Sequence, residues 1–173
     1  ALGMAFAEGS ANDWLALAIV DGRDASNAIG ALWFGFFTAG MMAGRIGGVW
    51  VLDRFGRVPV LQASAGLAIL GLALVIMVAQ PVVSGVGALL WGIGSSLGFP
   101  VAMSAAADDV RGSAARVSAV ATLAYGAFLI GPPLIGGVGE AVGLLAALWA
   151  VVLLILVAFF ASPAASPTKT ASP

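Results

Sequence analysis

The sequence contains no cysteine and no histidine, and only 9% of its 173 residues are charged. The two absences exclude disulfides, thiol chemistry, histidine-dependent hydrolysis and the usual transition-metal sites. We therefore expect no metal, no cofactor and no enzyme activity. No nucleotide-binding motif is present, so we do not expect ATP to drive the protein. The net charge of −1 gives no reason to expect a nucleic acid partner.

The scarcity of charge also decides the class of protein. Hydrophobic residues make up 61% of the chain, and its mean hydropathy is +1.10. A water-soluble domain carries about 25% charged residues. A chain with so few cannot cover itself with a polar surface, so the sequence predicts an integral membrane protein whose partner is the lipid bilayer.

Six segments are apolar over about the 20 residues that a bilayer-spanning helix needs. They predict an all-α membrane domain over residues 1–161, followed by a disordered tail over residues 162–173, which are rich in Ser and Pro. Ala1 already lies inside an apolar run without basic residues before it, so we expect a helix that begins upstream rather than a signal peptide. The segments are Ala1–Val20, Ala28–Leu52, Val58–Ala79, Val82–Ala107, Ser113–Val138 and Ala141–Ala161.

The basic residues predict the orientation. Loops one, three and five contain only Arg23, whereas six basic residues lie in or near the second and fourth loops and the tail. Because cytoplasmic loops of membrane proteins are enriched in Lys and Arg, both ends of the chain should face the cytoplasm, in the plasma (bacterial inner) membrane. The six are Arg45, Arg54, Arg57, Arg111, Arg116 and Lys169.

Two acids lie inside the first apolar segment. Counted from Asp21 at 1.5 Å per residue, Asp13 is about 12 Å and Glu8 about 20 Å from the outer end of the helix. An ionised carboxylate at such depth costs about 2.5–3.5 kcal/mol. Glu8 shares a helix face with Asn12, whereas Asp13 points about 100° away, so one acid should face a cavity and the other a neighbouring helix. Either acid is a candidate for proton coupling or substrate contact, and the alternative is a paired acid that holds helices together.

Weaker candidates lie in the fourth segment. Trp91 and Ser95 share one face and can offer a stacking surface with a hydroxyl group to a cavity, although such residues more often make helix contacts. Trp33 and Trp50, near the ends of the second segment, are typical of interfacial belt residues.

Small residues and prolines punctuate the other helices. Gly40, Gly44 and Gly48 follow one another at a spacing of four in the second segment, which predicts a face of bare backbone for close helix packing. Gly94 and Gly98 repeat the pattern in the fourth. Pro100 and the pair Pro132-Pro133, with Gly131 beside it, predict kinks, which either gate a cavity or are static.

A charge cluster separates the second and third segments. The order Gly44-Arg45-x-x-Gly48-x-x-x-x-Asp53-Arg54-x-Gly56-Arg57 resembles the G-x-x-x-D-R-x-G-R-R loop signature of the major facilitator superfamily, with Val49 and Val58 as departures. Arg111-Gly112-x-Ala114 resembles the family's R-G-x-A segment, and Gly131-Pro132-Pro133-x-x-Gly136-Gly137 its fifth-helix signature with one residue inserted.

The resemblance implies the C-terminal six-helix half of a twelve-helix transporter, built from two inverted three-helix repeats. It further implies alternating access, a cavity lined by the first and fourth helices, and third and sixth helices that face lipid. It assigns Gly48, Asp53, Arg54, Gly56 and Arg57 to a cytoplasmic gate, where a topology anchor is the alternative.

The expected function is secondary active transport of a small solute, coupled to protons or another ion. The expected partner is a missing N-terminal half or a second copy of the chain. A non-transporting membrane scaffold and an inactive transporter fragment are the alternatives. The substrate and the direction of coupling are not encoded in any motif.

Overall fold

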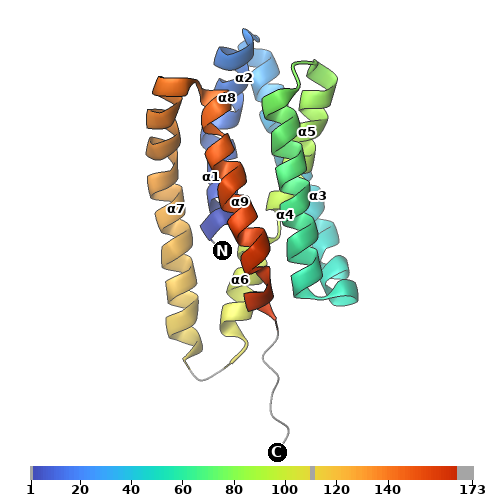
Figure 1. Cartoon of the computed structure of the whole chain (residues 1–173). Coiled ribbons are helices and arrows are strands. Elements are labelled where there is room, and N and C mark those ends of the chain that lie inside the picture. Colours follow the sequence, from blue (N-terminus) through green and yellow to red (C-terminus); the bar gives the residue numbers. More distant parts are fainter. Residues whose placement is uncertain (1, 110–111, 167–173) are drawn as a thin grey trace, which may run out of the picture.

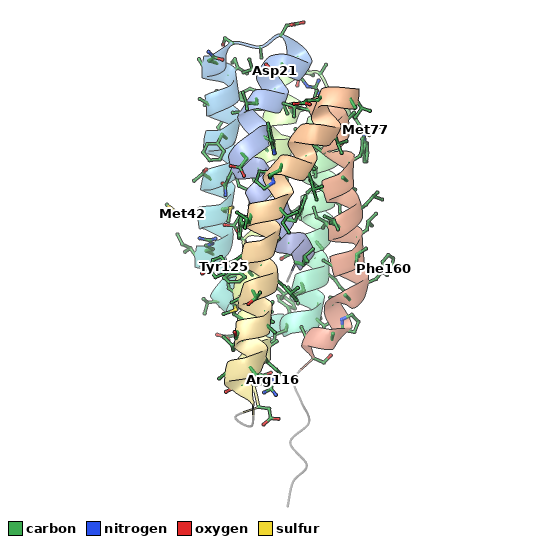
Figure 2. All side chains as sticks on the ribbon, turned by 90° about the vertical axis from the view of Figure 1, so that its left-hand side faces the viewer. Asp21, Met42, Met77, Arg116, Tyr125 and Phe160 are labelled. Atoms are coloured by element: carbon green, nitrogen blue, oxygen red, sulfur yellow. The ribbon has the colours of Figure 1, made fainter. Side chains whose placement is uncertain are left out.

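The computed structural model describes residues 2–109 and 112–166, and within these ranges it is helical and has no strand. Figure 1 shows long helices lying side by side along a common direction. Figure 2 labels Asp21 at one end of the bundle and Arg116 at the other, and we name the two ends after these residues. Arg111 and Lys169, which entered the orientation argument, lie outside the described residues.

All six predicted segments form helices, but several are interrupted. Within the described residues, five helices are long and apolar enough to cross a membrane, and the interrupted first segment is not among them. The first span comprises α1 (Leu2–Ser10), the π-helical turn η1 (Ala11–Leu15) and α2 (Ala16–Arg23), the second is α3 (Asn27–Phe55) and the third is α4 (Arg57–Met77). The fourth comprises α5 (Pro81–Ser95) and α6 (Gly98–Ala107), the fifth is α7 (Ser113–Val142) and the sixth comprises α8 (Leu144–Ala147) and α9 (Trp149–Ala161).

The start of the tail differs from the expectation of disorder. Ser162–Ala165 form a 3₁₀ turn, η2, and Ser162 is buried, its hydroxyl donating to the carbonyl of Phe159 at 2.7 Å. This local hydrogen bond and the following Pro163 extend the end of α9 by one turn, which a composition argument does not detect. Residues 167–173 lie outside the described residues.

The packing is that of two inverted three-helix repeats. The first span packs on the fifth and sixth, and the fourth span packs on the second and third in the matching way. The contact of the first span with the second, through α2 and α3, is matched by that of the fourth with the fifth, through α6 and α7. The third and sixth spans meet each other through α4 and α9. Exchanging the two repeats therefore leaves the set of helix contacts unchanged.

Glycines bring the second span against the fourth. A methyl group at Gly40 would overlap the carbonyl oxygen of Leu89, and one at Gly44 would overlap the hydroxyl of Ser96. Gly48 meets the side chain of Leu97 in the same way. All three contacts fall on α5 or the break after it, so the spacing of four does produce one face of close approach.

One tryptophan and one arginine near the Asp21 end have roles that their positions in the sequence did not predict. Trp33 is not an interfacial anchor, because it is buried and its indole donates to the Ser84 hydroxyl at 3.2 Å. Arg23 donates to the carbonyls of Val75 and Ile76, at 2.6 and 3.1 Å, in the last turn of α4. A cation there satisfies free carbonyls and complements the helix dipole. The one basic residue at the Asp21 end of the described residues is therefore a helix cap.

Candidate functional site

Glu8 and Arg45 form an ion pair between the first and second spans. Arg45 Nη2 donates to Glu8 Oε1 at 3.0 Å. Arg45 lies ten residues before Phe55, or about 15 Å from the end of α3, so the pair is well inside the bundle's length. The Glu8 side chain is 17% exposed and that of Arg45 is 52% exposed, so the guanidinium is the more accessible member.

The π-helical turn η1 carries the other polar residues of the first span. Asn12 and Asp13 lie in this turn and are both exposed, whereas Trp14 is half-buried against α7 near Gly136. π-turns change the direction in which successive side chains point and are frequent at functional sites. The turn η1 contacts α3, so these two exposed residues lie on the same pair of adjacent spans as Glu8 and Arg45. We call Glu8, Asn12, Asp13 and Arg45 together the polar face. Figure 2 shows Met42, one turn before Arg45, and Tyr125 on α7 both in the middle part of the bundle, away from its two ends.

Trp91 and Ser95 are enclosed between helices. Trp91 is fully buried and meets Phe37 edge-to-face at a centroid distance of 5.4 Å. Ser95 is 1% exposed. Within the described residues, Trp91 Nε1 and Ser95 Oγ have no hydrogen-bond partner. Neither side chain reaches the polar face, so we leave both out of the site proposed below.

The loop signature forms a contact at the Arg116 end. Arg57, the first residue of α4, donates two hydrogen bonds to the carboxylate of Asp108 just after α6, and a third to the Ser104 hydroxyl at 2.9 Å. The Arg57 hydrogen bond holds the pKa of Asp108 below its usual value, since the bond favours the charged carboxylate. This clasp joins the first repeat to the second within the chain.

The rest of the signature is exposed. Gly56 has φ +79° and ψ 170°, a positive-φ conformation that glycine adopts without strain, and it lets α4 start directly after α3. Asp53 and Arg54 are exposed and make no ion pair within the described residues. Gly48 is buried against Leu97, as described above. The signature thus contributes one clasp, one turn and two accessible charges.

The fourth span breaks beside Pro100. Pro100 stands in the first turn of α6, and its ring would clash with the carbonyl of Ser96, where α5 has just ended. Gly94 faces the backbone of α4 at Ala68, and Gly98 faces Met4. The small residues therefore allow the broken span to pack on both of its neighbours.

α7 continues through Pro132 and Pro133, and Gly131 packs on the ring of Phe6. The prolines remove two backbone donors without ending the helix, which is therefore locally weakened there.

A cavity of about 440 Å³ lies at the Arg116 end, away from the polar face. Its lining is mostly alanine from α6, α7 and α9, together with Met4 and Gly98, and Arg116 is its charged member. No acid lines it, so it is not the place where the candidate coupling residues meet.

Sequence reasoning missed three partners. Arg45 was noted for orientation and within the loop signature but not as the partner of Glu8, although an arginine inside an apolar span is a functional signal in itself. Asp108 and Ser104 gave no signal beyond their place at the end of the fourth span. No local pattern could have paired them with Arg57, which is 51 and 47 residues away.

The architecture and the ion pair together define a polytopic membrane protein with ionisable groups at membrane depth. Comparison with known proteins narrows the class. The chain is 33% identical over 166 residues to an uncharacterized transporter from Sinorhizobium fredii, covering 90% of this chain and 44% of that protein. It is 29% identical over 154 residues to an uncharacterized MFS-type transporter from Yersinia pestis, covering 88% and 40%.

A third relative is the membrane protein MosC from Rhizobium meliloti, 30% identical over 138 residues, which covers 79% of this chain and 34% of MosC. No family model matches the chain, and no solved structure gives a significant match. The resemblance to the major facilitator superfamily is confirmed, and the chain is homologous to a part of such MFS-type transporters. It spans less than half the length of each of these curated relatives.

Proposed function

We propose that the chain is the C-terminal six-helix half of a secondary active transporter that moves a small solute by alternating access, coupled to protons or another ion. The polar face is the observation that carries this proposal. Charged side chains inside a membrane are costly and are kept where they face a water-filled path or a partner. The helices of the opposite side, α4 and α9, have no charged residue beyond Arg57 at the start of α4.

The distribution of charge supports a second six-helix unit against the polar face. Arg45 is 52% exposed and lies between exposed apolar side chains of α3, including Met42, Ile46 and Val49. Lipid would leave the free guanidinium donors unsatisfied, whereas a second unit across a water-filled cavity would not. The N-terminal half or a second copy of the chain is the partner that we propose.

The clasp at the Arg116 end supports a gate. Arg57 is occupied by Asp108, while Asp53 and Arg54 are exposed and unpaired in the described part of the chain. Two free charges of opposite sign are available for contacts with the other half in one conformation only. Contacts made in one state and broken in the other bias the equilibrium between the two.

Placing this gate at the cytoplasmic surface follows the excess of arginine at the Arg116 end, and it would put both chain ends in the cytoplasm of a cell with the protein in its plasma membrane. Arg23 does not oppose this orientation, since it is used as a helix cap.

Alternating access is testable because the chain has no cysteine. A cysteine introduced at Asn12 on the polar face, in the complete protein with any cysteine outside this chain replaced, can be labelled in sealed proteoliposomes with a membrane-impermeant maleimide from either side. We expect labelling from both sides, with a ratio that changes when the proton gradient is reversed. Labelling from one side under every gradient would oppose alternating access and favour a non-transporting scaffold or an inactive fragment.

A further inference from the structure

We propose that Arg45 is the binding site for an anionic, carboxylate-type solute, and that Glu8 takes up one proton when the anion binds. This inference deepens the proposed transport function and rests on it. Before binding, Glu8 is the counter-ion of Arg45. After binding, the carboxylate of the solute replaces it, and Glu8 is neutral.

The exposure of the two partners points to an anion as the ligand. The guanidinium is 52% exposed and the carboxylate only 17%, so a solute on the polar face reaches Arg45 first. Within the described residues, Arg45 makes one hydrogen bond, from Nη2 to Glu8. A guanidinium has five N–H donors in a planar fork that matches a carboxylate. The donors left over are arranged for a second carboxylate.

Charge balance explains why a proton should accompany the anion. The pair of Glu8 and Arg45 is neutral, and a net charge at this depth is costly. Adding an anion alone would give the site a net negative charge. Adding an anion to Arg45 and a proton to Glu8 leaves the sum unchanged. The proton goes to the Glu8 carboxylate, and no covalent bond of the solute changes.

The other charged groups near the pair do not replace this arrangement. The first span also carries Asp13, which is exposed, five residues further along, and makes no ion pair within the described residues. Of the packed helices in the described part of the chain, α5, α6 and α9 bring no ionisable side chain between their ends, and α7 brings Tyr125, whose side chain is exposed. Asp13 would attract a cation, so the experiment must distinguish binding of a cation at Asp13 from binding of an anion at Arg45.

The first experiment measures binding to the complete purified protein with benzoate as the anionic probe and choline as the cationic probe. Calorimetry in two buffers of different ionisation enthalpy gives the number of protons taken up per benzoate. We expect about one proton, with affinity falling about tenfold per pH unit over the range in which Glu8 is ionised in the free protein and protonated in the complex. Glu8→Gln should bind benzoate with no proton uptake and no pH dependence, and Arg45→Gln should not bind it. Glu140→Gln, an exposed acid near the end of α7, is the matched control and should behave as wild type.

Failure of benzoate to bind Glu8→Gln, where Arg45 has lost its partner, would overturn the proposal. Choline binding that depends on Asp13, without benzoate binding, would overturn it as well. Proton uptake that survives in Glu8→Gln would assign the proton elsewhere.

A second measurement does not depend on the solute. Phenylglyoxal modifies accessible arginines, and mass spectrometry can compare Arg45 with Arg54 in the same molecule. Loss of Glu8 should raise the ratio of Arg45 to Arg54 modification several-fold, and benzoate should reverse the rise. An unchanged ratio would mean that Glu8 does not control Arg45. Gradient-driven transport that persists in Arg45→Gln would contradict the anion site but leave the proposed transport function standing. If the protein with an intact Arg45 shows no transport, and maleimide labelling at position 12 does not respond to the gradient, the proposed transport function itself is wrong.

Discussion

The two three-helix repeats pack in the same way but carry different side chains at mid-depth. The first repeat, Leu2–Met77, holds Glu8, Asp13 and Arg45 inside its spans. The second, from Pro81 to Ala161, has its ionisable groups near the helix ends, apart from Tyr125. Each repeat has an irregular leading span, a π-turn in the first and a break after Ser95 in the fourth. Symmetric packing therefore does not require symmetric chemistry, since one repeat supplies the ionisable groups at mid-depth.

The largest expected effect tests the shared packing. In Gly94→Val, a side chain would overlap the backbone of Ala68 on α4, and overpacking of this kind costs about 1–3 kcal/mol or more. We expect loss of folded protein or a large drop in thermal stability in detergent. Gly47→Val is the control, because Gly47 has no atom within 4 Å of an added Cβ. Equal behaviour of the two variants would contradict the close approach of α5 to α4.

The second prediction tests the chemical difference between the repeats. Glu8→Gln should lower proton-coupled transport by about a hundredfold, equivalent to about 2.7 kcal/mol, and abolish its pH dependence. Glu140→Gln in the second repeat should leave transport within about twofold of wild type, because its carboxylate is exposed near the Asp21 end. The measurement is gradient-driven flux in proteoliposomes. If both variants lose transport equally, Glu8 has no role in transport that an exposed acid of the second repeat lacks.

The third prediction concerns a feature that the repeats share. Gly56 precedes α4, the third span, with φ +79°, and Gly143 takes the matching place before α8, the start of the sixth span, with φ +87°. An alanine in this positive-φ, extended-ψ region costs about 1–3 kcal/mol, so Gly56→Ala and Gly143→Ala should each lower thermal stability by a similar amount. Gly35→Ala, at a helical glycine with open space around it, should raise stability slightly instead.

The smallest expected effect concerns the clasp between the repeats. Because Arg57 lowers the pKa of Asp108 in the folded state, the pair contributes stability above the unfolded pKa of Asp108, about 3.9, and loses it as the pH falls through the lower folded pKa. The pair is partly exposed, so its contribution should be about 1 kcal/mol or less. Thermal unfolding of wild type and Asp108→Asn should differ by a constant amount from pH 7 to about pH 5 and converge below the folded pKa. A difference that grows on acidification would contradict the sign of this shift.

The helices could be predicted because each signal is local. Apolar runs, the turn at Gly56 and the proline at the start of α5 all act over a few residues. The π-turn at Ala11–Leu15 had no such signal, and it decides that Asn12 and Asp13 are both exposed. For Trp91 the sequence signal was present but ambiguous. An indole and a hydroxyl at a spacing of four fit a cavity wall and a buried helix contact equally well, and the structure shows the buried contact.

The sequence by itself determined that this is a membrane protein of six helical spans, because hydrophobicity and chain length decide what a bilayer accepts. It also determined which side chains would be costly there. The tertiary structure alone decided how that cost is met. Glu8 finds Arg45 across 37 residues, Arg57 finds Asp108 across 51, and Arg23 finds the last turn of α4 across 52. Such pairs depend on which helices become neighbours, and neighbours are chosen by the fit of small-residue faces such as that of Gly40 and Gly44, not by the charges themselves.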